Sequence, residues 1–275
     1  MTLEFFMDKV GLSDPVKEVI TGFVISDEED SKLYDLFLNN WDEFEKLLNE
    51  KDDPNRFALG LIGNWAYRSY DLWMEKGIPE DIFYATLYDL TIWSKRCLDR
   101  TGKVGLIEWR WFIVHITARI FRLGRLQFEP GGLKGQSITM PDGTIIPDGT
   151  PLLGVHIPRG DGFNPESIRE SFEMAKTFFP KYIGKYYDTY ICSSWLLAPQ
   201  IESMISPTSS IAYFRSYFTV YGEHKGYSQI EDYIFVKKLD DKTKYPEDTS
   251  LRRNVKKYLL EGGEIGMGEA IGFFK

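Results

Sequence analysis

A segment near the middle of the chain combines residues that could bind an anion with a residue that could move a proton. It reads Gly154-Val155-His156-Ile157-Pro158-Arg159-Gly160-Asp161-Gly162-Phe163-Asn164-Pro165. Its apolar part, 152–157, predicts a buried strand, and an Asn-Pro pair is typical of the start of a helix. A helix N-terminus attracts anions, Gly160 and Gly162 allow close backbone approach, and Arg159 adds positive charge. The segment predicts an anion site, with an ordinary turn and a solvated Arg159 as the alternative.

Few side chains in the sequence are placed for proton transfer at neutral pH. His156 lies within the predicted strand, and histidine is the residue type that most readily exchanges a proton near neutrality. The alternative is a core histidine bonded to a backbone carbonyl. Glu202 begins a short predicted helix, where it is either a general base or an acidic residue that favours the helix N-terminus.

The remaining nucleophilic and metal-binding residue types are isolated in the sequence. Cys192 lies in an apolar segment, which predicts a buried, inert thiol, although a cysteine nucleophile would indicate a covalent acyl-enzyme. His115 and His224 stand far from each other and from any Cys or carboxylate at ligand spacing. We therefore predict no metal site.

The composition excludes several classes of protein. The 275 residues include 33 Lys and Arg against 41 Asp and Glu, a formal charge of −8, and no basic stripe, so a nucleic-acid partner is not expected. Two cysteines fit a reducing compartment. The first residues lack the apolar core of a signal peptide, and the apolar stretch 109–121 is too short to span a bilayer. We expect a soluble cytoplasmic protein without a membrane partner.

The elements around this segment indicate an α+β protein of two domains. Residues 1–120 read as a helical domain in which aromatic residues recur at helical spacing, and no chemistry is visible there. Residues 121–275 read as a mixed α/β domain with two Pro-Asp-Gly-Thr turns and a strand–helix–strand unit at its centre. The longer expected helices cover 61–77, 79–102, 107–120, 164–178 and 251–260. The expected strands cover 152–157, 190–197, 218–221 and 233–238, and a Gly-rich tail follows the last helix.

The order of elements after residue 121 resembles the GNAT-type N-acyltransferase fold. The whole chain is similar to a bacterial group of acyltransferases with a helical N-terminal domain and a GNAT-like C-terminal domain. The resemblance rests on the strand–loop–helix–strand order of 152–197 and on a helix and aromatic strand over 209–218. It also rests on the family's diphosphate signature, which is Gln or Arg, any two residues, Gly, any residue, then Gly or Ala. Arg159 and Gly162 match this signature, whereas Asn164 departs from it.

The resemblance implies a role for each residue of the segment. The backbone of Val155 to Ile157 would pair with the pantetheine of coenzyme A, and the loop Arg159–Gly160–Asp161–Gly162–Phe163–Asn164 would hold the diphosphate. The acyl carbonyl would lie where this strand parts from the strand at 190–195. His156 or Glu202 would act as base, and Tyr213, or else Tyr217, would act as the acid that protonates the departing sulfur.

These roles predict an acyl-CoA-dependent N-acyltransferase that acts on an amine of a small-molecule acceptor, with acyl-CoA as cosubstrate and no metal. A homodimer is left open. The alternative is a non-catalytic protein that binds a small molecule or acyl-CoA on a GNAT-like fold. A hydrolase using Glu202 and Glu223 finds no support in their spacing.

Overall fold

The computed structural model describes residues 1–160, 162–226 and 229–274. The chain divides into two compact units. The first comprises Met1–Leu123 together with Pro158–Gly160, and the second comprises Gly124–Ile157 and the described residues after 161. The predicted fold class is confirmed, because a helical N-terminal region is followed by a GNAT-like domain with a mixed sheet.

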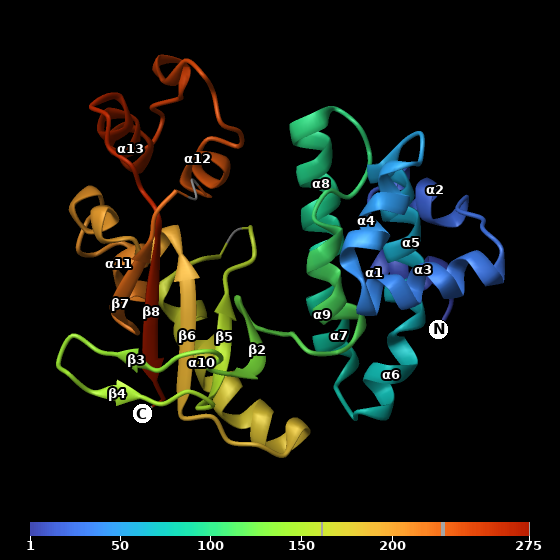
Figure 1. The fold of residues 1–275 in the computed structure, drawn as a ribbon, viewed down its shortest axis with the longest axis horizontal. Helices are drawn as coiled ribbons and strands as arrows, with labels where there is room; N and C mark the ends of the chain where they lie inside the picture. The colour runs from blue at the N-terminus through green and yellow to red at the C-terminus, as the bar shows by residue number, and fades with distance from the viewer. Residues whose placement is uncertain (161, 227–228, 275) are drawn as a thin grey trace. The chain divides into compact units, whose positions relative to one another are not determined.

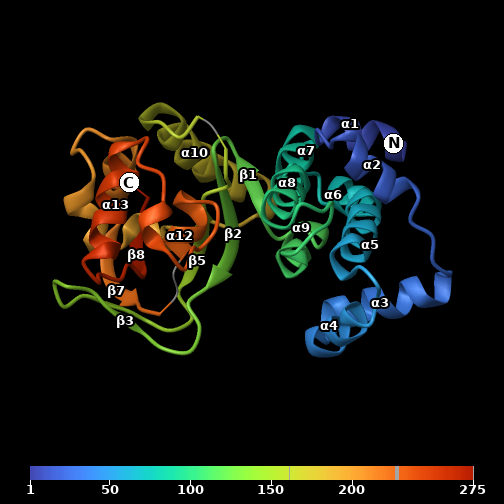
Figure 2. The same ribbon diagram turned by 90° about the horizontal axis from the view of Figure 1, so that it is seen from above.

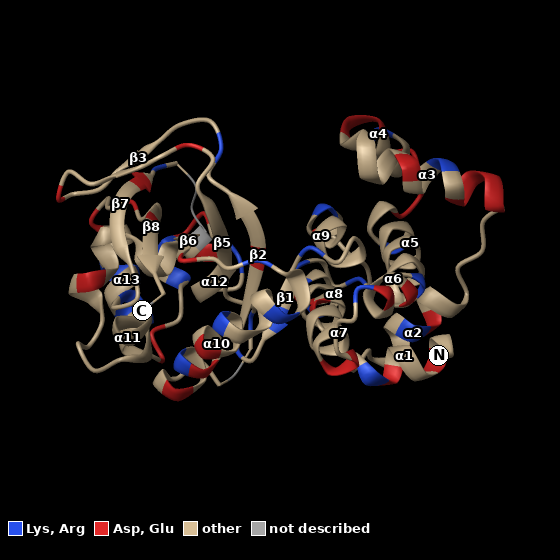
Figure 3. Ribbon diagram, turned by 90° about the horizontal axis from the view of Figure 1, so that it is seen from below, with Lys and Arg blue, Asp and Glu red and all other residues tan. Residues whose placement is uncertain are grey.

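The first unit is built from short helices that begin at polar caps. Asp53 accepts a hydrogen bond from the N–H of Arg56 at 3.1 Å, and Pro54 occupies the first helical position, as expected for a helix start. Four acidic residues in the first turn of α3 complement its N-terminus, and Figure 3 shows them gathered there. The elements are α1 (Leu3–Lys9), α2 (Asp14–Thr21), α3 (Asp27–Asn39), α4 (Trp41–Asn49), α5 (Pro54–Arg68), α6 (Tyr70–Glu75), α7 (Glu80–Leu87), α8 (Asp89–Thr101), η1 (Trp109–Trp111), α9 (Phe112–Ile116) and β1 (Phe121–Leu123).

Three helices expected in this unit are shorter or broken in the structure. The helix expected over 61–77 breaks at Ser69, and the one over 79–102 breaks at Tyr88. The helix expected over 107–120 is a 3-10 turn followed by α9, which ends at Ile116. Ala118 has a φ of 51°, and the N–H of Arg119 bonds to the carbonyl of Val114 at 2.8 Å. This is a Schellman-type end, which closes the helix before the predicted boundary.

Aromatic side chains form the core of the first unit. The rings of Phe44 and Trp109 lie 4.8 Å apart, and those of Phe37 and Trp65 lie 5.2 Å apart. Trp73 packs edge-on against Phe83. Such tilted and edge-to-face contacts are the favoured geometry of aromatic pairs. The aromatic stripes predicted as core are buried in the structure.

The second unit is organised around a mixed sheet. The sheet order is β1-β2-β5-β6-β8-β7, and the last five of these strands belong to the second unit. Pairing is antiparallel for β2–β5, β6–β8 and β7–β8, and parallel for β5–β6. The strands are β2 (Leu126–Gly132), β5 (Pro151–His156), β6 (Thr189–Ser194), β7 (Thr219–His224) and β8 (Met267–Phe273), and β3 (Ile138–Thr139) pairs with β4 (Ile145–Ile146) as a separate hairpin.

The two faces of this sheet are covered differently. Helix α10 (Pro165–Phe178) lies on one face and the β3–β4 hairpin lies on the other, as Figures 1 and 2 show. On the α10 face, the ring of Phe172 lies 4.8 Å from that of Tyr190 and 5.7 Å from that of Phe128. On the hairpin face, Ile138 and its neighbours pack around Ile271, with Ile191 against them. The two Pro-Asp-Gly-Thr turns therefore belong to the β3–β4 hairpin and its exit, which pack on one face of the sheet.

Three elements of the second unit differ from the prediction. The strand expected over 233–238 is absent, because Tyr233 and Ile234 end helix α12 (Gln229–Ile234) and Val236 has a φ of 73°. The Gly-rich tail contains an internal strand, β8, which pairs with both β6 and β7. The strand expected over 190–197 ends at Ser194, where a 3-10 turn, η3 (Trp195–Leu197), begins.

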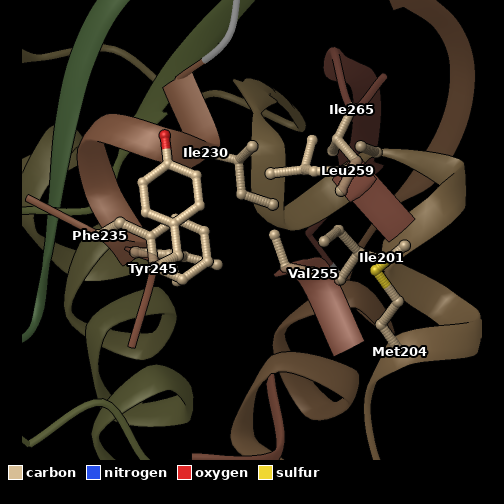
Figure 4. Packing of buried hydrophobic residues seen from close by; sticks show 10 residues of the cluster. Ile201, Met204, Ile230, Phe235, Tyr245, Val255, Leu259 and Ile265 are labelled. Atoms are coloured by element: carbon tan, nitrogen blue, oxygen red, sulfur yellow. The ribbon is translucent and has the colours of Figure 1, made fainter. Parts of the chain in front are cut away.

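The segments after β6 form a second hydrophobic cluster. They include η4 (Pro199–Met204), α11 (Ser210–Arg215), η5 (Lys242–Lys244) and α13 (Ser250–Leu260), whereas η2 (Phe179–Ile183) lies between α10 and β6. Ile230 and Val255 are fully buried, and the ring of Phe235 stacks on that of Tyr245 at 4.0 Å. Figure 4 shows these side chains converging from α12, α13 and η4. The cluster explains why 229–234 is helical, since Ile230 and Ile234 lie four positions apart and both enter it.

Candidate active site

The ladder between β5 and β6 is short. It joins Leu153 to Tyr190 and Gly154 to Ile191, and it ends there. Beyond it, β5 runs on to His156 along β2, whereas β6 runs on from Cys192 to Ser194 along β8. The two central strands therefore share only two paired positions and then follow different neighbours, which is the separation that the family resemblance implied.

His156 lies at the end of β5, on the face that the β3–β4 hairpin covers. Successive residues of a strand point to opposite faces, so Gly154 and His156 share a face with Ile191, and Val155 points toward the α10 side. The Nε2 atom of His156 lies 3.2 Å from Oε2 of Glu129 on β2, and the two side chains are about one-third exposed, at 35% and 33%. His156 is thus not a fully buried core histidine. Glu129 was not predicted from the sequence.

The predicted loop turns through glycines. Gly160 and Gly162 have φ values of 132° and 79°, a backbone conformation that side chains other than glycine rarely adopt. Arg159 is half-buried and belongs with Gly160 to the first unit, and Ile157 is half-buried beyond the end of β5. Asp161 lies outside the described residues.

Asn164 caps helix α10. Its Oδ1 accepts a hydrogen bond from the N–H of Ser167 at 3.0 Å, and the Ser167 hydroxyl accepts one from the N–H of Asn164 at 3.3 Å. This reciprocal capping box confirms the predicted helix start. It also gives a physical reason for the departure from the diphosphate signature, because the asparagine side chain itself occupies an amide that glycine or alanine would leave open.

A buried arginine lies next to this turn. The guanidinium carbon of Arg125 is 5.5 Å from the centre of the Phe163 ring, and the Phe163 ring contacts Phe214 of α11. Arg125 directly follows Gly124 in the turn before β2, a position that no sequence pattern marked as a ligand site. The structure thus adds a positive charge beside residues 162–164.

Tyr213 of α11 and Tyr217, two residues beyond the end of that helix, form a pair on the α10 side of the sheet. The hydroxyls of Tyr213 and Tyr217 lie 3.3 Å apart, and the ring of Tyr217 stacks on Phe172 at 4.4 Å. Burial, reinforced by the hydrogen bond with Tyr213, raises the pKa of Tyr217. A raised pKa keeps the Tyr217 hydroxyl protonated but makes it a weaker acid, so it gives Tyr217 no added strength as a proton donor.

Glu202 lies on the surface. Its side chain is 82% exposed and forms an ion pair with Arg215 at 3.5 Å. The Arg215 guanidinium also donates to the carbonyls of Leu196 and Ala198, so it ties the turn after β6 to α11. An exposed carboxylate in this position fits the alternative interpretation, an acidic residue in the first turn of η4, better than that of a base.

The other chemically interesting residues have structural roles. Cys192 is buried, and burial raises the pKa of its thiol to about 12, which agrees with an inert thiol. His115 is fully buried in the first unit, where Nε2 lies 3.0 Å from Oδ2 of Asp89, which also accepts from the indole of Trp111. His224 ends β7 and is exposed. The His115–Asp89 pair could not be inferred from sequence, because 26 residues separate its members.

A cavity of about 290 Å³ lies at the other end of α10 from its Asn164 cap. Lys176, Phe179, Tyr187 and Asp188 line it, together with Leu153, Ala175, Pro180, Tyr186 and Phe274. It does not include His156 or the turn at 162–164. Among the described residues no cluster of His, Cys, Asp and Glu could hold a metal ion, and no helix is long and apolar enough to cross a membrane.

Comparison with known families places this geometry in context. Residues 120–274 match the model of a GNAT-like C-terminal domain. The chain belongs to this GNAT-like family. Residues 1–118 match the model of an N-acyltransferase N-terminal domain, and the two assignments together identify the protein as a GNAT-like acyltransferase.

Solved structures share the fold of this GNAT-like protein. An acyltransferase in complex with decanoyl-CoA and teicoplanin is 21% identical with a TM-score of 0.79, and the match covers 99% of this chain and 88% of that one. An acyltransferase mutant in complex with octanoyl-CoA is 20% identical, with the same TM-score and coverage. At this level of identity the likeness shows the fold. The comparison with curated proteins found no match.

Proposed function

We propose that this GNAT-like protein transfers an acyl group from acyl-CoA to an amine of a small-molecule acceptor. The observation that carries the proposal is the early end of the β5–β6 ladder at Gly154 and Ile191. Pantetheine contains two amides and can pair like a strand with an exposed backbone edge. Beyond Gly154, the edge of Val155 that faces away from β2 is where such pairing would occur.

The turn into α10 supports a diphosphate site. Gly162 has a positive φ and precedes a helix N-terminus, an arrangement that favours anions. Because Asn164 caps the N–H of Ser167, the diphosphate would be held mainly by amides ahead of the cap, with positive charge from Arg159. Gly160 of the same loop stays a predicted contact of the diphosphate.

The proposed chemistry is direct attack by the amine. His156 would take a proton from the acceptor ammonium, and the freed nitrogen lone pair would attack the thioester carbonyl to form a C–N bond. Collapse of the tetrahedral intermediate would break the C–S bond, and Tyr213 would protonate the departing thiolate. The nitrogen would then lose its second proton, which restores the Tyr213 phenol, and His156 would release its proton to solvent, giving an amide and free coenzyme A. His156 and the Tyr213–Tyr217 pair lie toward opposite faces of the sheet, which suits an acceptor and a thioester that meet from opposite sides.

The solved neighbours suggest which acyl groups to test first. Their complexes contain octanoyl-CoA, decanoyl-CoA and teicoplanin, so medium-length acyl groups and acceptors of the glycopeptide class are the first candidates. The cytoplasmic location, the homodimer and a domain boundary between residues 120 and 121 stay predictions.

A thermal-shift and turnover experiment tests the proposal. Acetyl-, octanoyl- and decanoyl-CoA should raise the Tm, because a ligand that binds only the folded state stabilises it. Adding an accepted amine should then release free thiol, measured with a chromogenic disulfide. No shift with any acyl-CoA would refute the proposal, and a shift without thiol release from a broad amine panel would instead support the non-catalytic binding protein.

His156→Ala tests the assignment of the base. Turnover should fall by about two orders of magnitude or more, the usual contribution of a general base. The Kd for coenzyme A should stay near the wild-type value, because the imidazole does not bind the nucleotide. His224→Ala is the matched control, since His224 is exposed at the end of β7. Equal losses of turnover and of unfolding free energy in His156→Ala would instead assign it a structural role.

A further inference from the structure

A carboxylate on the neighbouring strand reaches the histidine proposed as base. In the antiparallel register of β2 and β5, Glu129 stands opposite Gly154, and Gln127 stands opposite His156. Glu129 and His156 are therefore diagonal neighbours on one face of the sheet, at a separation that long side chains can bridge. Their side chains meet with Oε2 and Nε2 3.2 Å apart.

Gly154 provides the space for this contact. A Cβ atom at position 154 would stand 3.4 Å from Nε2 of His156 and 3.7 Å from Cβ of Glu129. Its φ is not in the left-handed region, so the backbone does not require glycine there. The imidazole therefore lies over position 154 on its way to the carboxylate, at a distance where a Cβ would make ordinary van der Waals contact.

We infer that Glu129 is a positioning residue that fixes the ring and the tautomer of His156. This inference rests on the proposed function. A carboxylate only accepts hydrogen bonds, and a neutral imidazole carries one N–H, so the hydrogen resides on the nitrogen that faces Glu129. That nitrogen is Nε2, and the lone pair that takes the acceptor's proton is therefore on Nδ1.

The same contact assists after proton transfer. Once Nδ1 has taken the proton, the imidazolium carries a positive charge beside the carboxylate of Glu129, and opposite charges at this distance attract. The pair is two-thirds buried, so solvent screens it less than an ion pair at a fully exposed site. Orientation and charge stabilisation both act on turnover and not on coenzyme A binding.

The kinetic test replaces Glu129 in two backgrounds. Glu129→Leu should lower kcat by about tenfold to a hundredfold, the range seen when an orienting partner of a functional histidine is lost. KM for acyl-CoA should change little. In the His156→Ala background the same substitution should have almost no further effect, because the two residues act through one contact. Glu173→Leu is the matched control, since Glu173 lies on α10 with 61% of its side chain exposed.

A magnetic-resonance measurement tests the contact without turnover. The chain has three histidines, so the ring nitrogens of His156 can be assigned in ¹⁵N-histidine-labelled protein by comparison with His156→Gln. We expect the hydrogen of neutral His156 on Nε2, and we expect Glu129→Leu, but not Glu173→Leu, to shift the Nε2 resonance.

The two measurements separate the possible failures. A hydrogen on Nδ1 in the wild type, an Nε2 resonance unmoved by Glu129→Leu, or an equal kinetic loss in the presence and absence of His156 would overturn the role of Glu129. A wild-type protein that shows the expected resonances yet transfers no acyl group to any amine would leave the contact intact and would overturn the proposed function, and with it the catalytic meaning of Glu129.

Discussion

Replacing Asn164 by alanine separates the stability of α10 from the binding of coenzyme A. The Oδ1 atom of Asn164 accepts from the N–H of Ser167 at 3.0 Å, and alanine removes that acceptor. Loss of an N-cap side chain costs about 1 kcal/mol of unfolding free energy. For a domain of about 150–250 residues this corresponds to a fall in Tm of about 2–4 °C.

The same substitution should tighten the binding of coenzyme A. It leaves the N–H of Ser167 available to a diphosphate oxygen, and a hydrogen bond to a charged group contributes about 1.5 kcal/mol or more. A gain of this size corresponds to a Kd lower by about tenfold. Chemical denaturation measures the stability, and isothermal titration with coenzyme A measures the Kd.

A second capping residue provides the control. Thr249 accepts from the N–H of Arg252 at 3.1 Å at the start of α13, outside the proposed loop. Thr249→Ala should lose a similar unfolding free energy and keep the wild-type Kd. If Asn164→Ala binds coenzyme A no more tightly than the wild type, the N-terminus of α10 does not hold the diphosphate in the way argued above.

Three further predictions concern charge, thiols and packing. Arg159→Glu should raise the Kd for coenzyme A at about 0.05 M salt and do so much less at about 0.5 M, because salt screens exposed charges; an effect independent of salt would contradict a diphosphate contact. In the native protein a thiol reagent at mildly alkaline pH should label neither Cys97 nor Cys192, since both are buried and burial raises the pKa of each thiol. In denaturant both thiols should react. Rapid labelling of the native protein would contradict their burial. Gly268→Ala should lower the unfolding free energy by about 1–3 kcal/mol, since its Cβ would stand 2.1 Å from a backbone oxygen. Gly131→Ala is the control and should leave the unfolding free energy unchanged, because the space around Gly131 is open. Equal stability of the two variants would contradict the close packing at Gly268.

Local signals in the sequence were sufficient for part of the fold. The start of α10 was predictable, because the Asn164 side chain caps the helix and Pro165 occupies its first turn, and neither needs a distant partner. Gly102 ends α8 with a φ of 72°, as a C-terminal glycine should. The helical first region and the strand–helix–strand unit were predictable for the same reason, since their hydrophobic periods are long and clear.

Features that depend on distant contacts were not predictable. Strand β8 reads as a Gly-rich tail, but a Cβ on Gly272 would stand 2.2 Å from the carbonyl oxygen of Tyr217, so tertiary packing requires its glycines. The strand expected over 233–238 overlaps the end of the helix at 229–234. The helix forms there because its apolar residues pack into a cluster with η4 and α13, which the local sequence does not reveal. Tertiary context overrides local propensity in such cases.

The candidate site divides in the same way. His156 and the loop glycines could be selected from residue type and position. Glu129 could not, because its contact with His156 arises from the register of two strands whose interacting residues are 27 positions apart. The ion pair of Glu202 with Arg215 could not be foreseen either, since the two residues are 13 positions apart.

The position of β8 constrains the order in which the second unit can assemble. Residues 267–273 are translated after both of the strands between which they insert, so β6 and β7 have no shared neighbour until this segment arrives. During synthesis the edges of β6 and β7 therefore stay unpaired until β8 inserts between them. Stop codons before this segment, or tight fusions at Phe273, should consequently yield aggregation and not a partly active enzyme.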